Sequence, residues 1–343
     1  MLMPGEFAHG PGNSHRFVKV ISSGAMAVGA GNGFSIVLKD DGNVWSMGLN
    51  SKGQLGDGTR NRKNTFAFVK MIPGAKHVAA GGSHNMVLTQ QGTLWGVGWS
   101  KYGQLGEGST FGRTRFFLVM PFGVKTMATG DLHSILMKED GSVWAAGRNH
   151  NGQLGDGTEI DRSNFLKVMP GDAKDVAAGG YHSLILKQNG SLWTTGWNEY
   201  GQLGDGLTKD RLEFTQVIMS GVKIITAGSR HSMILKQDGS VWGTGYNRYG
   251  QLGDGSTKTI VVYKQVMSGG ATVVAAGAFH SMVIKEDGSI WATGSNKHGQ
   301  FGDGLTTSTK VFVRVMPFIN GAIYDSIIRI STCLCDPTTN IMD

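Results

Sequence analysis

Short runs of alternating apolar and polar residues follow one another along most of the chain, separated by turns that contain glycine. One run, at 182–187, reads HSLILK, and the next, at 191–197, reads SLWTTGW, with Gln188-Asn189-Gly190 between them. Alternation with a period of two is typical of β-strands, and Asn-Gly or Asp-Gly between two runs favours a type I′ hairpin. The pattern therefore predicts an all-β chain of short antiparallel strands.

The strand pattern recurs at a fixed interval. Six tryptophans are separated by 50 residues once and by 49 residues four times: Trp45, Trp95, Trp144, Trp193, Trp242 and Trp291. Five histidines stand eleven residues before the later tryptophans, and Phe34 takes that place in the first copy: His84, His133, His182, His231 and His280. A period of this length indicates a repeat architecture.

Each repeat reads as four short strands, and four-stranded sheets repeated around an axis form a β-propeller. A single blade of this kind cannot bury both faces, so neighbouring blades must cover it. We therefore expect the tryptophans and the apolar residues at 184–186 to lie in the core between blades.

The repeat resembles the regulator of chromosome condensation repeat family. The resemblance rests on AAGGYHS at 177–183, DGSVW at 140–144 and NxxGQLGDGT at 149–158, and it covers residues 17–316. Members of that family are typically seven-bladed propellers, so the resemblance implies seven blades, although only six copies here are complete.

The two ends of the chain together have about the length of one repeat. We predict a seven-bladed propeller with four-stranded blades and complete repeats at about 17–311. Residues 1–16 and 312–343 would form a degenerate seventh blade that closes the ring. The alternative is six blades with frayed ends. Either way, residues 1–343 are expected to form a single propeller domain and a monomer.

Composition narrows the class of protein. Glycine accounts for 54 of 343 residues, more than twice its usual share of about 7%, which excludes long helices. The two cysteines, Cys333 and Cys335, cannot form a disulfide framework. The sequence shows no signal peptide and no transmembrane segment. We expect an intracellular protein, cytoplasmic or nuclear.

The repeated polar residues favour structure over chemistry. The GQLGDG loops lack the GK[ST] and helix pattern of phosphate-binding loops. Metal and catalytic sites are built once, from unlike residues that converge, whereas these histidines occur once per blade. We expect a half-buried histidine bonded to backbone of its own blade. The sequence thus predicts no catalytic residue, no metal and no cofactor.

Positions that differ between repeats are the candidates for recognition. Those between the tryptophan strand and GQLG should share one side of the propeller and present rings and basic groups: Trp99, Tyr102, Arg148, Trp197, Tyr200, Tyr246, Arg248, Tyr249, Lys297 and His298. Such side chains are enriched at interface hot spots. A second set precedes the histidines, near the expected axis: Gly33, Ser83, Leu132, Tyr181, Arg230 and Phe279.

A third, basic set follows GDGT and includes Arg113, Arg115, Arg162 and Arg211. The first interpretation of these residues is ordinary charge on solvated loops. The preferred hypothesis is a non-enzymatic protein-interaction scaffold that binds a protein partner, possibly a small GTPase or an acidic surface, through the aromatic and basic loop face.

Two alternatives remain open. Guanine-nucleotide exchange on a small GTPase is implied by the family's founding member, but the repeat spacing leaves no room for the inserted hairpin wedge which that activity uses there. Chromatin or nucleic-acid binding is supported by a net charge of +7. A UV-B photoreceptor of similar fold uses Gly-Trp-Arg-His-Thr motifs, whereas residues 228–232 here read GSRHS, without the tryptophan.

Overall fold

A computed structural model describes residues 15, 16, 21 and 23–316. In this part of the chain, 24 strands form six four-stranded antiparallel sheets. The first three sheets comprise β1 (Ala25–Gly31), β2 (Phe34–Lys39), β3 (Asn43–Gly48) and β4 (Lys63–Met71); β5 (Ala75–Ala80), β6 (His84–Thr89), β7 (Leu94–Gly98) and β8 (Arg113–Met120); and β9 (Val124–Thr129), β10 (His133–Lys138), β11 (Val143–Gly147) and β12 (Arg162–Met169). The other three comprise β13 (Ala173–Ala178), β14 (His182–Lys187), β15 (Leu192–Gly196) and β16 (Arg211–Ile218); β17 (Val222–Ala227), β18 (His231–Lys236), β19 (Val241–Gly245) and β20 (Ile260–Met267); and β21 (Ala271–Ala276), β22 (His280–Lys285), β23 (Ile290–Gly294) and β24 (Thr309–Met316).

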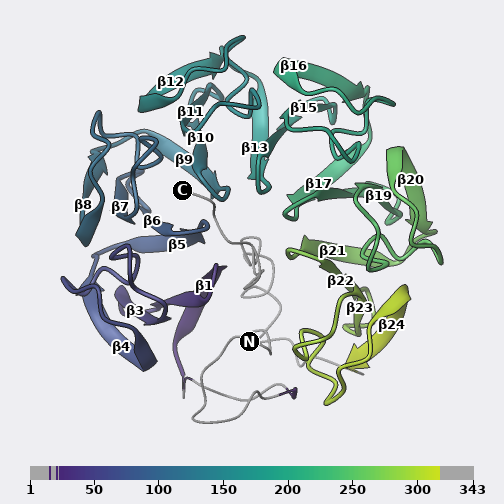
Figure 1. Cartoon of the computed structure of the whole chain (residues 1–343), viewed down its shortest axis with the longest axis horizontal. Coiled ribbons are helices and arrows are strands. Elements are labelled where there is room, and N and C mark those ends of the chain that lie inside the picture. Colours follow the sequence, from purple (N-terminus) through teal and green to yellow (C-terminus); the bar gives the residue numbers. More distant parts are fainter. Residues whose placement is uncertain (1–14, 17–20, 22, 317–343) are drawn as a thin grey trace.

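The six sheets are the blades of a β-propeller (Figure 1). Within each blade the strands follow chain order, the first strand lying nearest the axis and the fourth on the perimeter. The predictions of an all-β chain and of four-stranded blades are confirmed. The described strands include no seventh blade, and most of the terminal segments predicted to form it (1–14 and 317–343) lie outside the described residues.

The turn between the second and third strands differs from the prediction. Gly141 has φ +76°, but Asp172 is the one non-glycine residue with positive φ in the described part of the chain, so Asp140 cannot be in a type I′ turn. The backbone N–H of Lys138 instead donates to the carbonyl of Ser142, across a three-residue connection. A type I turn followed by a left-handed glycine produces this connection.

The core is divided among the contacts between neighbouring blades. Five clusters of buried apolar side chains each draw residues from two adjacent sheets, as where Leu88 and Leu94 meet Val124 and Leu136. A sixth cluster, which includes Ile290, comes among the described residues from the last sheet alone. The propeller is thus stabilised mainly between sheets.

The repeated tryptophans are half buried, and five of the six pack at the borders of these clusters: Trp95, Trp144, Trp193, Trp242 and Trp291. Trp144, for example, packs against the cluster between the second and third blades. The ammonium of Lys138 lies 4.0 Å from its ring centroid, and the indole Nε1 donates to the Ser142 hydroxyl at 2.9 Å. A cation over the outer ring face completes the contacts of the side chain.

The repeated histidines are buried, and four of the five join neighbouring blades in the described part of the chain. The expectation of half-buried rings bonded within their own blade is therefore wrong. In four cases the ring Nε2 lies 2.8–2.9 Å from the hydroxyl of a serine 50 residues later, in the next blade: His84 and Ser134, His133 and Ser183, His182 and Ser232, His231 and Ser281. Burial lowers the pKa of each of these four imidazoles to about 3, and that of His280 to about 4.

The GQLGDG loops also connect neighbouring blades. Gly155 has φ +75°, and a Cβ there would overlap the ring of Phe214, on the outermost strand of the next blade. At the next residue, Asp156 or its equivalent, each loop forms a β-bridge to that strand, as between Asp254 and Val311. In the sixth blade the equivalent bridge joins Asp303 to Arg16. In the part of the chain described here, no helix could cross a membrane.

Candidate interaction surface

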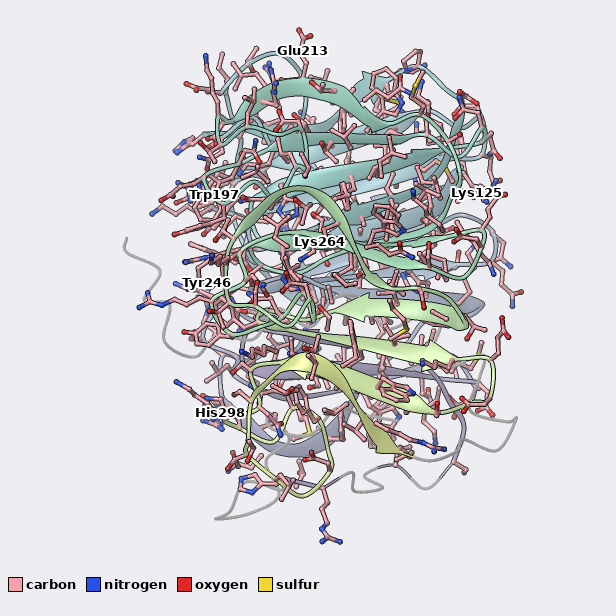
Figure 2. All side chains as sticks on the ribbon, turned by 90° about the vertical axis from the view of Figure 1, so that its right-hand side faces the viewer. Lys125, Trp197, Glu213, Tyr246, Lys264 and His298 are labelled. Carbon is pink, nitrogen blue, oxygen red and sulfur yellow. The ribbon has the colours of Figure 1, made fainter. Side chains whose placement is uncertain are left out.

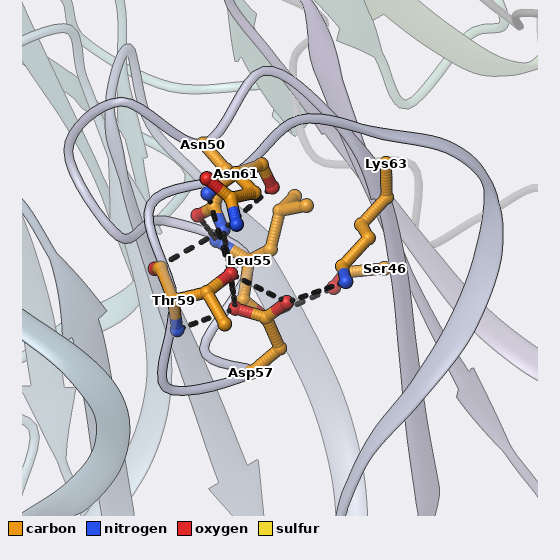
Figure 3. Close-up of polar contacts among 7 residues, drawn as sticks. All are labelled: Ser46, Asn50, Leu55, Asp57, Thr59, Asn61 and Lys63. Carbon is orange, nitrogen blue, oxygen red and sulfur yellow. Dashed lines mark hydrogen bonds and ion pairs between the residues drawn. The ribbon is translucent and has the colours of Figure 1, made fainter.

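The loops between third and fourth strands are fixed by a repeated polar network (Figure 3). In the first blade, Asn50 accepts the backbone N–H of Leu55 at 3.0 Å and donates to Asp57 at 3.1 Å. Asp57 in turn accepts the backbone N–H and the hydroxyl of Thr59. Asparagine and aspartate can bond the backbone of a turn in this way, so these residues fold the loop back on itself.

The glutamine of each GQLG tetrad holds the variable residue two positions before it. Its side-chain oxygen accepts that residue's backbone N–H at 2.9–3.1 Å; the residues held in this way are Lys52, Tyr102, Asn151, Tyr200, Tyr249 and His298. The bond involves only the backbone, so it leaves the side chain free to vary between blades. The repeat therefore presents a lysine, a tyrosine, an asparagine or a histidine from the equivalent position of its blades.

These side chains lie on one side of the propeller. Figure 2 shows Trp197, Tyr246 and His298 along one side, whereas Lys125 lies on the opposite one. Because every loop from a third to a fourth strand begins at the same end of its blade, the variable positions of all six blades open onto this side. We call the surface formed by the contacting rings from Trp99 to Phe279, with the cations that lie over them, the aromatic face.

The rings of the aromatic face are in contact across consecutive blades. Centroid separations are 5.8 Å for Trp99 and Tyr102, 6.2 Å for Tyr102 and His150, 5.9 Å for Tyr181 and Trp197, 5.3 Å for Trp197 and Tyr200, 4.9 Å for Tyr200 and Tyr246, 6.1 Å for Tyr246 and Tyr249, and 5.1 Å for Tyr249 and Phe279. Five cations lie over these rings: Lys52, Lys101, Arg148, Arg230 and Lys297. Edge-to-face pairs and stacked cations each stabilise such a cluster modestly.

Eight of the ten predicted interface residues belong to this cluster. The other two, Arg248 and His298, are exposed at its border, and Arg248 lies beside Tyr246. The second variable set does not form a separate surface. Tyr181, Arg230 and Phe279 interleave with the first set, because the backbone N–H of Trp197 bonds the carbonyl of Tyr181 at 2.8 Å and brings the two loops together.

Sequence reasoning missed an outer group of apolar side chains on the same loops. Four residues just after the GDG turns are exposed: Phe111, Ile160, Leu207 and Leu305. The available signal was an apolar residue one to three positions after a polar turn. These side chains add exposed apolar surface to the loops that carry the rings, and exposed apolar patches often mark interaction sites.

The centre of the face is electrostatically distinctive. Tyr181 is half buried, and the carboxylate of Asp131 and the guanidinium groups of Arg148 and Arg230 all act on its hydroxyl. Burial first, and then the negative charge of Asp131, raise the pKa of Tyr181 to about 12. The phenol is therefore neutral at physiological pH, and the charges at the centre are those of the arginines and Asp131.

Much of the third, basic set is engaged inside its own blade. Arginine and aspartate pair at 2.7 Å between Arg162 and Asp156 and at 2.8 Å between Arg211 and Asp205. Arg113 pairs with Glu107 at 3.0 Å. These charges stabilise loops and are only partly available to an acidic partner. Within the described residues no group of three metal-ligating side chains occurs, and Cys333 and Cys335 lie outside them.

Comparison with known proteins agrees with this architecture. The family model for the RCC1-like domain matches residues 5–333, which confirms the resemblance seen in the repeats. No curated protein sequence matches the chain.

Solved structures of similar fold include the following two. Human WBSCR16 has a TM-score of 0.77 and 24% sequence identity, over 86% of this chain and 82% of that one. Prp20p from Saccharomyces cerevisiae, described by its binding to Gsp1p and histones, has a TM-score of 0.75 and 22% identity, over 86% of this chain and 77% of that one. At these identities the likeness establishes the fold.

Proposed function

The chain belongs to the RCC1-like domain family, and from that premise we propose that it is a non-enzymatic scaffold that binds a protein partner through the aromatic face. The observation that supports this most strongly is the unbroken succession of rings from Tyr181 to Phe279, held on loops of three consecutive blades. Rings and arginines on rigid loops are the groups from which interface hot spots are built.

Exposed apolar side chains favour a protein over a nucleic acid as the partner. Phe111 is 78% exposed and Ile160 is 61% exposed, on the same loops as the rings. A nucleic-acid surface relies on free cations along the phosphate backbone, whereas Arg113, Arg162 and Arg211 are paired with carboxylates. A protein partner uses both the apolar and the cationic groups.

Affinity capture tests this function. The full chain and a variant with Trp99, Trp197, Tyr200 and Tyr249 all changed to alanine are compared as baits, after circular dichroism shows that both are folded. We expect the variant to lose the partners that the native chain captures. Identical capture profiles would show that the aromatic face is not the binding surface.

Guanine-nucleotide exchange is the second candidate. Family membership supports it, as does the similarity in fold to Prp20p, which binds Gsp1p, a small GTPase. The wedge-type mechanism uses an inserted hairpin, whereas all described strands here belong to the six regular sheets. Release of labelled GDP from a panel of small GTPases separates the candidates, because a scaffold leaves the release rate unchanged.

Chromatin or nucleic-acid binding is a third candidate, supported by the net charge of +7 and by the histone binding described for Prp20p. It predicts an affinity for duplex DNA that falls steeply with salt. An intracellular location, cytoplasmic or nuclear, and a monomeric state are parts of the same proposal.

The proposal extends to a seventh blade closed by both ends of the chain. Three observations support it: the bridge from Asp303 to Arg16, which repeats the bridge from Asp254 to Val311; the buried cluster on the sixth sheet; and the buried Nε2 of His280, which has no partner among the described residues. Deleting residues 317–343 should lower the unfolding temperature strongly. An unchanged unfolding temperature favours six blades with frayed ends.

A further inference from the structure

Two arginines on the aromatic face lie against rings and have no carboxylate partner in the described part of the chain. The guanidinium carbon of Arg148 lies 5.6 Å from the ring centroid of Tyr102 and 5.3 Å from that of Tyr181. That of Arg230 lies 5.5 Å from the ring centroid of Trp197. Neither arginine is among the ion pairs formed by described residues.

The arginines that begin the fourth strands have carboxylate partners. Arg113, Arg162 and Arg211 each contact a carboxylate six residues earlier in the chain, at 2.7–3.0 Å. These pairs recur from blade to blade and fix the loop. Arg148 and Arg230 stand at positions where the repeat varies, and they depart from this rule by packing against rings from neighbouring blades.

The rings leave the hydrogen-bonding edges of these guanidinium groups for another molecule. A guanidinium that stacks on a ring keeps its donors in its own plane, where they match the two oxygens of a carboxylate. The Nε of Arg148 is buried and has no acceptor among the described residues. The side chain as a whole is half buried, so an anion at the surface meets its other donors.

The surroundings favour a carboxylate over a phosphate. Asp131 lies close enough to Tyr181 for its charge to act on that hydroxyl, as both arginines do. A doubly charged phosphate meets more repulsion from Asp131 than a singly charged carboxylate does. The rings and the exposed side chains of Phe111 and Leu207 suit apolar residues next to the acidic ones.

On the basis of the proposed function, we infer that Arg148 and Arg230 bind Asp or Glu side chains of an acidic, partly apolar protein segment laid across the aromatic face. The two arginines belong to the third and fifth blades, with Tyr181 of the fourth blade between them. The segment therefore runs across three blades. The arginines set the preference for acidic residues, and the rings provide apolar contact.

A displayed library of random 16-residue peptides, selected on the full chain, tests this inference. We expect enriched peptides to combine Asp or Glu with aromatic or aliphatic residues. Their affinity should fall at least tenfold when the acidic residues become Asn or Gln, and equally in the Arg148→Gln, Arg230→Gln variant. The control variant Lys125→Gln, Lys223→Gln removes the same charge from the first strands of two blades and should bind normally.

The outcomes distinguish this inference from the proposed function. If the Trp197→Ala, Tyr200→Ala variant loses the peptides but the arginine variant keeps them, the face binds proteins and the carboxylate inference is wrong. If neither variant loses them, both proposals fail. Enrichment of peptides without acidic residues, or binding of a labelled DNA duplex in place of peptides, also overturns the inference.

Discussion

The Nε2 atom of His84 lies 2.8 Å from the hydroxyl of Ser134 in the next blade, and this hydroxyl donates its proton to the carbonyl of Gln104 at 2.8 Å. A serine hydroxyl has one proton, so the imidazole must be the donor in the first bond. His84 is therefore neutral and carries its proton on Nε2, while its buried Nδ1 has no partner in the described structure. The bonds run from one blade to the next and back again.

Removing the hydroxyl of Ser134 should destabilise the propeller more than its size suggests. In Ser134→Ala, the buried donor of His84 and the buried carbonyl of Gln104 both lose their partner. We expect a loss of about 2–4 kcal/mol in the free energy of unfolding, measured by urea denaturation. The exposed Ser51→Ala variant serves as the control and should change stability by less than about 0.5 kcal/mol. Equal effects of the two substitutions would show that the hydrogen bonds among His84, Ser134 and Gln104 contribute little to stability.

Acid should weaken the fold at a pH where most carboxylates are still ionised. The buried histidines have pKa values of about 3 or 4 in the folded chain and about 6.5 when unfolded. Their stability contribution is complete above pH 6.5 and is lost as the pH falls from 6.5 toward 3, because protons bind preferentially to the unfolded chain. Each can contribute a slope of up to about 1.4 kcal/mol per pH unit.

One carboxylate opposes this trend. Burial raises the pKa of Asp175 to about 6, so its protonation favours the folded chain as the pH falls from 6 toward 4. One such group does not cancel five histidines, so the net stability should still decrease. Urea denaturation at pH 7.5, 6.5, 5.5 and 5.0 checks the sign. Constant stability over this range would contradict the neutral, buried state of the histidines.

Gly155→Ala should be more damaging than another substitution at a glycine of similar conformation. Both Gly155 and Gly221 have positive φ, but a Cβ at Gly155 overlaps the Phe214 ring, whereas one at Gly221 has nothing within 4 Å. Backbone strain costs about 1–2 kcal/mol at each site, and the overlap adds about 1–3 kcal/mol at Gly155 alone. Thermal unfolding of the two variants measures the difference. Equal unfolding temperatures would show that the ring moves aside freely.

The polar network beneath the aromatic face should control both stability and binding. Asn198 accepts the backbone N–H of Leu203 and donates to Asp205, so Asn198→Ala should release the loop that presents Trp197 and Tyr200. We expect a loss of about 2–3 kcal/mol in stability and weaker partner binding. Asn198→Ser is the matched control, because serine stands naturally at the equivalent Ser100, and it should be milder. An alanine variant that binds normally would show that the loop holds without its asparagine.

The contact between the first and second blades, where the histidine–serine pair is replaced, offers a further test. Phe34 replaces the histidine there and Asn85 the serine; Asn85 donates to the carbonyl of Gln54, while its own side-chain oxygen is buried without a partner in the described structure. Phe34→His and Asn85→Ser should each destabilise the folded chain. Together they should create the histidine–serine hydrogen bond found between the other blades. A double-mutant cycle should give a favourable coupling of about 1–2 kcal/mol. Additive effects would contradict the pairing.

The sequence identified the blades because their pattern is local. The alternation of HSLILK and the fixed tryptophan spacing needed no knowledge of distant contacts. The turn type was missed because Asp-Gly suits both a two-residue and a three-residue connection. The bond from the Ser142 backbone N–H to the Asp140 side chain, at 2.9 Å, accompanies the longer one.

Contacts between blades were harder to predict. Nothing in the spacing reveals that His84 reaches a serine 50 residues away rather than its own backbone. In the same way, Tyr181 and Trp197 belong to different variable sets in sequence but are joined by a backbone hydrogen bond. The structure brings most of the predicted site residues into one cluster, and their role in binding stays a prediction.

The hydrogen bond from His84 to Ser134 has a direction, because the histidine of the earlier blade is the donor, as the equivalent serine bonds also require for His133 and His182. Whole repeats can therefore be added to or removed from the array, because each new pair of neighbouring blades again places a histidine against a serine. This arrangement suits growth of the gene by duplication of a 49-residue segment. Later changes would then be confined to the side chains that take no part in the hydrogen bonds between blades.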